Sequence, residues 1–202
     1  MKQFTTAALI AVFVVLAHTN ATHAQATQQM DTMALGDQPG YVPNPSEEEL
    51  DIIFQRQPVF FRTTQKPGTI IVHTSEHFLY LVKGNGRAIR YGVAVGGVGH
   101  QWTGIHRISH KKEWPDWIPT PETLARQPYL PRFMAGGPGN PMGARALYIG
   151  KTFYRIHGTN QPLSIGHSVS SGCIRLVNPD IINLYDRVPI GTKVIVRHAP
   201  RL

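Results

Sequence analysis

The residues with the clearest chemical potential lie between His157 and Arg175, and this stretch contains the only cysteine of the chain, Cys173. Because no second cysteine exists, Cys173 is an intermolecular disulfide partner, an inert buried side chain or a working thiol. A thiolate is a strong nucleophile, and nearby histidinium or arginine favours its formation. His157, His167 and Arg175 are such neighbours in sequence. The stretch therefore predicts covalent acyl transfer through Cys173.

Two histidines compete for the role of general base. His157 follows the strand-like run 153–156, and a strand end is a rigid mount. With an ordinary pKa of about 6.5, a histidine there can take the thiol proton and return it to a leaving amine. The alternative for His157 is a structural histidine bonded to backbone. His167 lies among loop residues that do not fix its position, so it is the second choice.

The residues next to the cysteine offer further functions. Gly172 permits close approach of the backbone, and the amides of Gly172 and Cys173 are predicted oxyanion donors. If the chain is extended here, Arg175 projects on the same face as Cys173 and meets either the thiolate or a substrate carboxylate. A surface ion pair is the alternative for Arg175. Ser170 and Ser171 orient the turn, although ordinary turn chemistry explains them equally well.

Two other chemistries fit less well. A zinc site built from His157, His167 and Cys173 matches no ligand spacing of the H-E-x-x-H or paired C-x-x-C kind. A serine hydrolase would require G-x-S-x-G, but the run 166–170 ends in Ser170. We therefore expect no metal and no cofactor.

The elements that must position these residues are mostly β-strands. Runs rich in β-branched and aromatic residues, bounded by turn residues, predict strands over 69–74, 77–82, 87–95, 146–149, 153–156 and 193–196. One helix is predicted after the cysteine, with Asn178 as its cap and Pro179 at the first helical position. The segment 102–143, rich in Trp, Pro, Arg and Gly, is expected to lack regular structure and to form either a lid or plain scaffolding.

The amino-terminal part predicts export. Residues 1–24 have the positive start, apolar run and small residues of a cleaved signal peptide. Residues 25–57 are expected to form a polar tether and a short helix, because Ser46 and Glu49 make a capping box. The catalytic domain is then 58–202. No other run is long enough to span a bilayer, so the processed protein is expected to have no transmembrane segment.

The formal net charge of the chain is +8, and the signal segment carries only Lys2 of it. A basic exported protein is drawn to anionic polymers, although a solvated basic surface explains the charge equally well. Export makes nucleic acid the least suitable partner.

The stretch around the cysteine resembles the signature of the YkuD-type L,D-transpeptidase catalytic domain. The matching residues are His157-Gly158-Thr159, Ile165-Gly166 and Ser170-Ser171-Gly172-Cys173-Ile174-Arg175, and the resemblance extends from about Thr69 to Val196. Many relatives have histidine where this chain has Ser171, so an auxiliary role of that position does not carry over.

The resemblance implies a mainly β, sandwich-like fold with one or two short helices and a long loop insertion. It implies that the carbonyl of Gly158 holds the far nitrogen of His157. Cys173 would form a thioester with the diaminopimelate carbonyl of a peptidoglycan tetrapeptide stem, release D-alanine and pass the acyl group to an amine. Substrate contacts are expected from Arg175, Ser170, Ser171, Thr159 and His167. The acceptor would be another stem, a D-amino acid or an envelope protein, on the periplasmic or wall-facing side of the membrane.

Two other functions are compatible with the same sequence features. Water in place of an amine would make the protein an L,D-carboxypeptidase or endopeptidase with the same site. A non-catalytic wall-binding module would rely on the basic surface and would lose binding in high salt.

Overall fold

The computed structural model describes residues 40–43 and 49–198. The predicted signal segment, most of the predicted tether and the predicted capping residue Ser46 lie outside these residues. In the part of the chain that the structure describes, no helix has the length and apolar character that a membrane crossing requires. The domain boundaries given above stay predictions.

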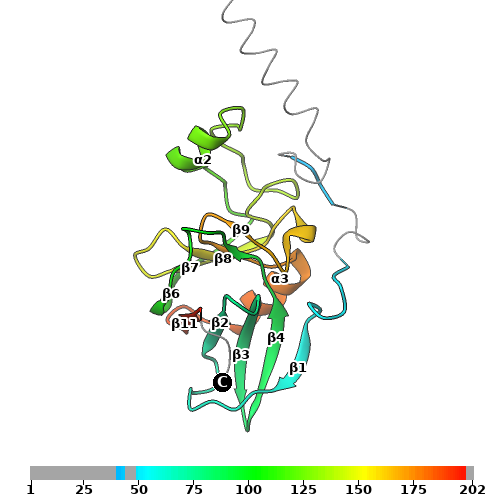
Figure 1. Ribbon diagram of the computed structural model, residues 1–202, viewed down its shortest axis with the longest axis vertical. Coiled ribbons are helices and arrows are strands. Elements are labelled where there is room, and N and C mark those ends of the chain that lie inside the picture. Colours follow the sequence, from blue (N-terminus) through cyan, green and yellow to red (C-terminus); the bar gives the residue numbers. More distant parts are fainter. Residues whose placement is uncertain (1–39, 44–48, 199–202) are drawn as a thin grey trace, which may run out of the picture.

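A sheet of nine strands dominates the described residues, with the order β1-β4-β3-β2-β11-β6-β7-β8-β10. Strands β5 and β9 form a separate pair. The mainly β class is confirmed (Figure 1). The strands are β1 (Gln57–Phe60), β2 (Ile70–His73), β3 (Phe78–Gly84), β4 (Arg87–Gly92), β5 (Val95–Gly96), β6 (Gly104–Glu113), β7 (Arg145–Ile149), β8 (Arg155–His157), β9 (Ser168–Ser170), β10 (Ile174–Arg175) and β11 (Lys193–Arg197). The helices are α2 (Pro121–Arg126), α3 (Asn178–Arg187) and the 3-10 turn Pro162–Ser164.

The predicted meander is present as β2, β3 and β4, which pair antiparallel in sequence order. Asn85 and Gly86 have φ values of 51° and 67°. Two successive residues with positive φ turn a hairpin in the direction of the natural strand twist, which explains the tight connection. The last strand, β11, pairs with β2 in parallel and with β6 antiparallel, so it links the meander to the rest of the sheet.

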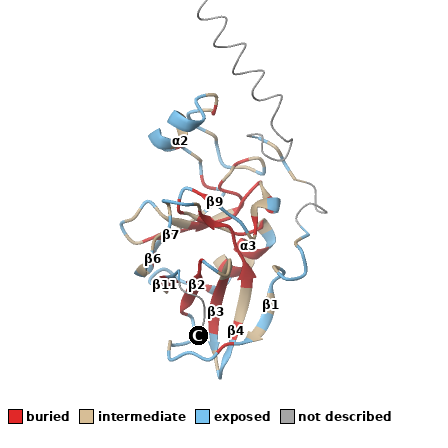
Figure 2. Ribbon diagram, viewed as in Figure 1, coloured by how far each residue is buried: buried red, intermediate tan, exposed pale blue. Residues whose placement is uncertain are grey.

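The strands of the meander are buried on both faces, which explains their uninterrupted apolar runs. Figure 2 shows β2 and most of β3 as buried, while β4 is partly buried and partly intermediate. Alternate residues serve two cores, so that Ile70 and Val72 face the larger one while Ile71 faces the smaller one. Ile181 and Leu184 of α3 belong to the larger core, which fixes this helix against the sheet.

The expectation that segment 102–143 lacks regular structure is wrong for its first third. Residues Gly104–Glu113 form β6, the longest strand, between β11 and β7. Only Ile108 of this strand is buried, so its hydrophobic pattern is too weak to reveal a strand. Hydrogen bonds from the two neighbouring strands stabilise it instead. The irregular part begins at Trp114 and contains only the short α2, which protrudes from the sheet in Figure 1.

Helix α3 is present as predicted, but its cap is different. Val177 occupies the N-cap position and makes no side-chain capping bond. The side chain of Asn178 instead accepts a hydrogen bond from the backbone N–H of Ala144, at 2.8 Å. The side-chain oxygen of Asn178 therefore binds the loop before β7 and does not cap the helix. This bond connects the helix to that loop.

Replacing Asn178 with alanine is expected to lower the free energy of unfolding by about 1–3 kcal/mol. Ala144 is only 1% exposed, so its N–H would lose its acceptor without access to water. Urea denaturation measures the change. Asn178→Asp is the matched control, because it keeps an acceptor oxygen and should lose less. Equal losses in the two variants would contradict this role of the side-chain oxygen.

The predicted short helix after Ser46 is not formed by the described residues that follow it. Residues 52–54 form a turn, in which the N–H of Phe54 donates to the carbonyl of Asp51 at 2.8 Å. The carbonyl of Phe54 accepts from Gly92 N–H at the end of β4, at 3.1 Å. The Phe54 ring packs on a small cluster that includes Val177. These tertiary contacts use the groups that a helix would need.

Candidate active site

Two short neighbouring strands carry His157 and Arg175, and Cys173 directly precedes the second of them. Strands β8 and β10 pair in parallel, with Ile174 opposite Ile156 and Arg175 opposite His157. Ile156 and Ile174 are both buried in the larger core. Since side chains alternate along a strand, His157 and Arg175 project from the opposite face. Cys173 directly precedes β10, and if the alternation of the strand extends to it, Cys173 lies on the same face as Arg175.

This register places the thiol and the imidazole diagonally across one strand pair. Regular strand geometry gives about 8 Å between the Cα atoms of Cys173 and His157. Two side chains of this size can bridge such a separation. Cys173 is partly exposed and forms no disulfide. The thiol is therefore partly open to solvent, whereas no hydrogen bond joins it to His157 among the described residues, and proton transfer between the two belongs to the proposed function.

The orientation of His157 is fixed by backbone. Its Nδ1 donates to the carbonyl of Gly158 at 2.5 Å, in a buried position. In the neutral ring this leaves the lone pair on Nε2. Gly158 is itself held closely, because a β-carbon at this residue would lie 2.5 Å from Oδ1 of Asn178. The predicted pairing of His157 with the Gly158 carbonyl is thus present in the geometry, and no carboxylate takes part in it.

The environment of His157 favours the neutral imidazole. Burial lowers the pKa of His157 to about 3, and the positive charge of Arg175 acts in the same direction, as does Arg155. Hydrogen bonds to the backbone at Gly158 and Met142 oppose the shift. A neutral imidazole accepts a proton, so in the resting state this ring is a base rather than half of a preformed ion pair.

Arg175 lies opposite the candidate base in the strand pair and two residues beyond the candidate nucleophile. Its backbone bridges to Ala94 through two hydrogen bonds. Its Nη1 donates to Oε1 of Gln161 at 3.0 Å, whereas Nε is buried without a partner. Burial lowers the pKa of this guanidinium, and the charge of the nearby Cys173 thiolate opposes that shift. No carboxylate partner is present among the described residues, so the surface ion pair considered for Arg175 is not formed there.

The loop before Cys173 is organised by Ser170, which is buried. Its Oγ donates to the carbonyl of Cys173 at 2.5 Å and accepts from the N–H of Gly172 at 3.2 Å. The Gly172 amide, expected as an oxyanion donor, is therefore directed at Ser170. The Cys173 amide is the remaining candidate of the predicted pair. Ser170 therefore shapes the loop from inside, and the substrate contact predicted for it stays a prediction.

Two aromatic residues that the sequence did not single out complete this loop. The indole N–H of Trp102 donates to the carbonyl of Gly172 at 2.7 Å. The ring of Trp102 stacks on Tyr154, with 4.4 Å between centroids and 3° between planes. A tryptophan N–H usually finds a partner when its ring is packed. That rule signals a hydrogen bond for Trp102, but it does not say which carbonyl accepts it.

Replacing Gly172 with alanine is expected to destabilise the fold and to disturb the nucleophile loop. Its φ is +105°, and an added β-carbon would lie 2.5 Å from Cε1 of Tyr154. The backbone strain alone corresponds to about 1–2 kcal/mol. Gly191→Ala is the matched control, because Gly191 has φ +89° with nothing within 4 Å of an added β-carbon. Urea denaturation should show a larger loss for Gly172→Ala; equal losses would contradict the contact with Tyr154.

The remaining predicted residues have different surroundings. Ser171 is exposed and accepts from Nη2 of Arg126 in α2 at 2.9 Å. This contact, which the sequence does not predict, joins the irregular segment to the nucleophile loop. Thr159 is buried, and its Oγ1 accepts from the N–H of Gln161 at 3.0 Å. His167 is exposed and its Nδ1 bonds the Ile165 carbonyl at 3.2 Å. Thr159 and His167 are thus bonded within their own turns.

A model of the L,D-transpeptidase catalytic domain, YkuD, matches residues 67–196. The chain belongs to this family. The match covers the meander, β6 and the whole stretch from His157 to Arg175, so the geometry above lies inside the family's catalytic domain.

The family includes curated relatives in Escherichia coli strain K12. The probable L,D-transpeptidase ErfK/SrfK is 40% identical over 140 residues, which cover 65% of this chain and 44% of that protein. The probable L,D-transpeptidase YbiS is 38% identical over 146 residues, covering 68% and 47%. The L,D-transpeptidase from Mycobacterium smegmatis has a similar fold, with TM-score 0.50, 18% identity and coverage of 64% and 58%. The matched part of the chain spans about half the length of these curated relatives.

Proposed function

We propose that this protein is an exported peptidoglycan L,D-transpeptidase in which Cys173 forms a thioester with the donor stem. The observation that carries the proposal is the arrangement of His157, whose Nδ1 is held by the Gly158 carbonyl on the same sheet face as Cys173. Membership of the L,D-transpeptidase family supports the reaction class.

In the first half-reaction, Nε2 of His157 removes the proton from the Cys173 thiol. The sulfur attacks the diaminopimelate carbonyl of the tetrapeptide stem, and the carbonyl oxygen becomes an oxyanion near the Cys173 amide. The carbon–nitrogen bond then breaks. The imidazolium of His157 returns its proton to the departing nitrogen, so D-alanine leaves as an amine and the thioester remains.

In the second half-reaction an amine attacks the thioester carbonyl, and His157 takes a proton from this amine. The carbon–sulfur bond breaks, and the sulfur leaves as a thiolate that recovers a proton from His157. An amine of a second stem would give a 3→3 cross-link, and an envelope protein or a free D-amino acid would give an attachment. Water would give hydrolysis, so exclusion of water decides between transpeptidase and carboxypeptidase.

Arg175 is suited to the substrate rather than to proton transfer. Its guanidinium keeps donors beyond the bond to Gln161, and it lies on the face of Cys173. Arginine binds carboxylates through paired hydrogen bonds. We propose that it binds a carboxylate of the stem peptide. The predicted signal segment would place this reaction in the periplasm or on the wall-facing side of the membrane.

Mass spectrometry of the protein with purified tetrapeptide stems tests this function. The expected result is a covalent adduct on Cys173 with the mass of the stem less D-alanine. Addition of a tripeptide or tetrapeptide acceptor should replace the adduct by a cross-linked product. Release of the free tripeptide stem in the absence of any amine acceptor would identify a carboxypeptidase. Binding of wall fragments without any adduct would identify the non-catalytic wall-binding module.

A further inference from the structure

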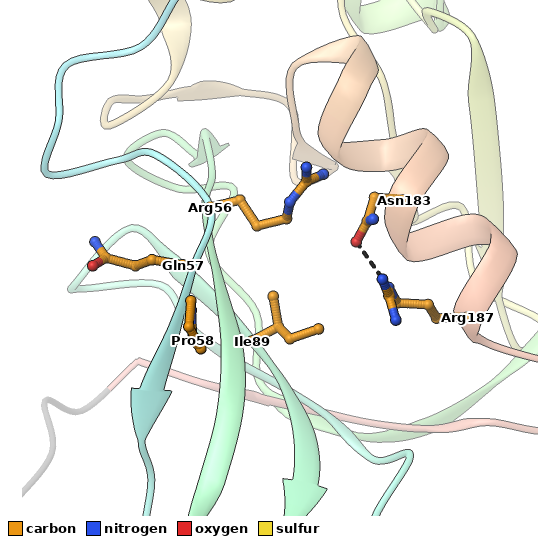
Figure 3. Close-up of a pocket in the computed structure, with 6 residues that line it drawn as sticks. All are labelled: Arg56, Gln57, Pro58, Ile89, Asn183 and Arg187. Carbon is orange, nitrogen blue, oxygen red and sulfur yellow. Dashed lines mark hydrogen bonds between the residues drawn. The ribbon is translucent and has the colours of Figure 1, made fainter.

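A second group of polar side chains lies outside the candidate active site, between the edge strand β1, strand β4 and helix α3. They border a pocket of about 280 Å³ (Figure 3). The lining residues are Arg56, Gln57, Pro58, Ile89, Asn183 and Arg187. All of them lie outside the segment 157–175, so the pocket is separate from the nucleophile loop.

The amide of Asn183 is held in one orientation. Its Oδ1 accepts from the hydroxyl of Tyr91 at 2.9 Å and from Nε of Arg187 at 3.0 Å. Because Nε of arginine can only donate, the oxygen must face it. These two bonds use both lone pairs of Oδ1. The amide nitrogen Nδ2 keeps two N–H donors, which make no hydrogen bond to the described residues.

The two arginines also keep donors for a ligand. Nη1 of Arg56 bonds the carbonyl of Pro179 at 3.3 Å and Oδ1 of Asp180 at 3.1 Å. Arg187 uses only Nε, for the bond to Asn183. Within residues 40–43 and 49–198, the other guanidinium nitrogens of these two side chains have no hydrogen-bond partner. Figure 3 shows Arg56, Asn183 and Arg187 around one space, with Gln57 turned away from it.

The charge at this pocket is positive. Asp180 pairs with Arg56, but no carboxylate of the described chain lies within ion-pair distance of Arg187. Burial raises the pKa of the adjoining Tyr91 to about 12; the charges of Arg187 and Arg56 both act against that rise, and the negative charge of Asp180 adds to it. Both positive charges therefore act at the same place. An anion is the ligand that such an excess favours.

The rest of the lining limits what kind of anion fits. Pro58 and Ile89 add apolar surface next to the donors. Ligand pockets usually enclose about 300–1,000 Å³, so this one has room for a single small residue. Arginine forks match the two oxygens of a carboxylate. An aliphatic carboxylate uses both the donors and the apolar surface, whereas inorganic phosphate uses only the donors.

We propose that this pocket binds the free carboxylate of a peptide that ends in a small aliphatic residue, as a second docking site for substrate apart from Cys173. That the peptide comes from the cell wall rests on the proposed function. The carboxylate site itself does not. Docking here would hold a second peptide end on the protein during turnover.

Titration followed by nuclear magnetic resonance tests the site, with N-acetyl-D-alanine as the probe. The protein carries Cys173→Ala, so the result is independent of catalysis and of the proposed function. We expect saturable shifts of the Asn183 side-chain amide and of Ile89. N-acetyl-D-alanine amide, which lacks the carboxylate, should give none. Equal shifts with the amide, equal affinity for inorganic phosphate, or no shifts at these two residues would each overturn the proposal.

Variants give a second measurement. Arg187→Gln is expected to weaken binding of N-acetyl-D-alanine about tenfold, and Arg187→Lys should also weaken it because it loses the fork. Arg87→Gln is the matched control. Arg87 is exposed on β4, the strand that contributes Ile89 to the pocket, but it does not line the pocket, and its replacement changes the net charge by the same amount. Equal weakening by Arg87→Gln would overturn the assignment in favour of a general charge effect.

Discussion

Replacing Cys173 with alanine is expected to lower turnover of tetrapeptide stems at least about a thousandfold and to remove the acyl adduct completely. The physical reason is that the proposed reaction passes through a carbon–sulfur bond, and no second cysteine exists to replace it. Release of D-alanine from purified stems measures the rate, and mass spectrometry of the intact protein measures the adduct.

Two controls separate chemistry from folding. Cys173 is partly exposed, so its loss should change the free energy of unfolding by less than about 1 kcal/mol. Cys173→Ser tests nucleophilicity at nearly constant shape, because a hydroxyl is far less acidic than a thiol, and we expect it to be almost as inactive as the alanine variant. Unchanged D-alanine release by Cys173→Ala in a folded protein would rule out the thioester.

The second large effect is expected at His157. Replacement with glutamine keeps a side-chain amide that can donate to the Gly158 carbonyl but removes the proton acceptor Nε2. General base catalysis contributes about 10²–10⁴-fold, so kcat/KM should fall by that range. The Cys173 adduct should still form, only slowly, which distinguishes this variant from Cys173→Ala. Wild-type kcat/KM in His157→Gln would show that another residue, such as His167, is the base.

His157 should also make the fold less stable in acid. Its pKa is lowered to about 3 by burial and by Arg175, against about 6.5 in the unfolded chain. Below pH 6.5 the unfolded state therefore binds a proton that the folded state does not. The free energy of unfolding then falls by about 1.4 kcal/mol for each pH unit until the folded ring titrates.

Asp180 acts in the opposite direction in part of this range. Burial raises its pKa to about 6, with Arg56 opposing, so the folded state takes up the proton first as the pH falls below about 6. Total stability therefore mixes two slopes of opposite sign. The difference between wild type and His157→Gln isolates the histidine, because Asp180 is common to both. Urea denaturation at pH 7, 6 and 5 should show this difference narrowing or reversing toward acid; a constant difference would contradict the buried neutral ring.

Much of the fold could be predicted because most of its strands have a clear residue pattern. The runs that became β2, β3, β7 and β11 combine β-branched residues with bounding turns, and their burial follows. Strand β6 could not be predicted in this way, because only Ile108 is buried and pairing with β11 and β7 holds the rest. Likewise the capping box before Leu50 was a local signal that the contact of Phe54 with Gly92 outweighed in the described residues.

The chemical groups of the candidate site can be read from residue types alone: a single thiol, a histidine at a strand end, an arginine two residues beyond the thiol, and the neighbouring glycines. These follow from residue types and spacing within one short stretch. How these groups are arranged relative to one another depends on the fold. The parallel pairing of β8 with β10 aligns His157 with Arg175, Asn178 reaches from α3 to the backbone beside Gly158 and Ala144, and Ser170 takes the Gly172 amide. The reason is physical: hydrogen bonds and electrostatic shifts depend on distances between segments far apart in the chain, and sequence spacing does not encode those distances.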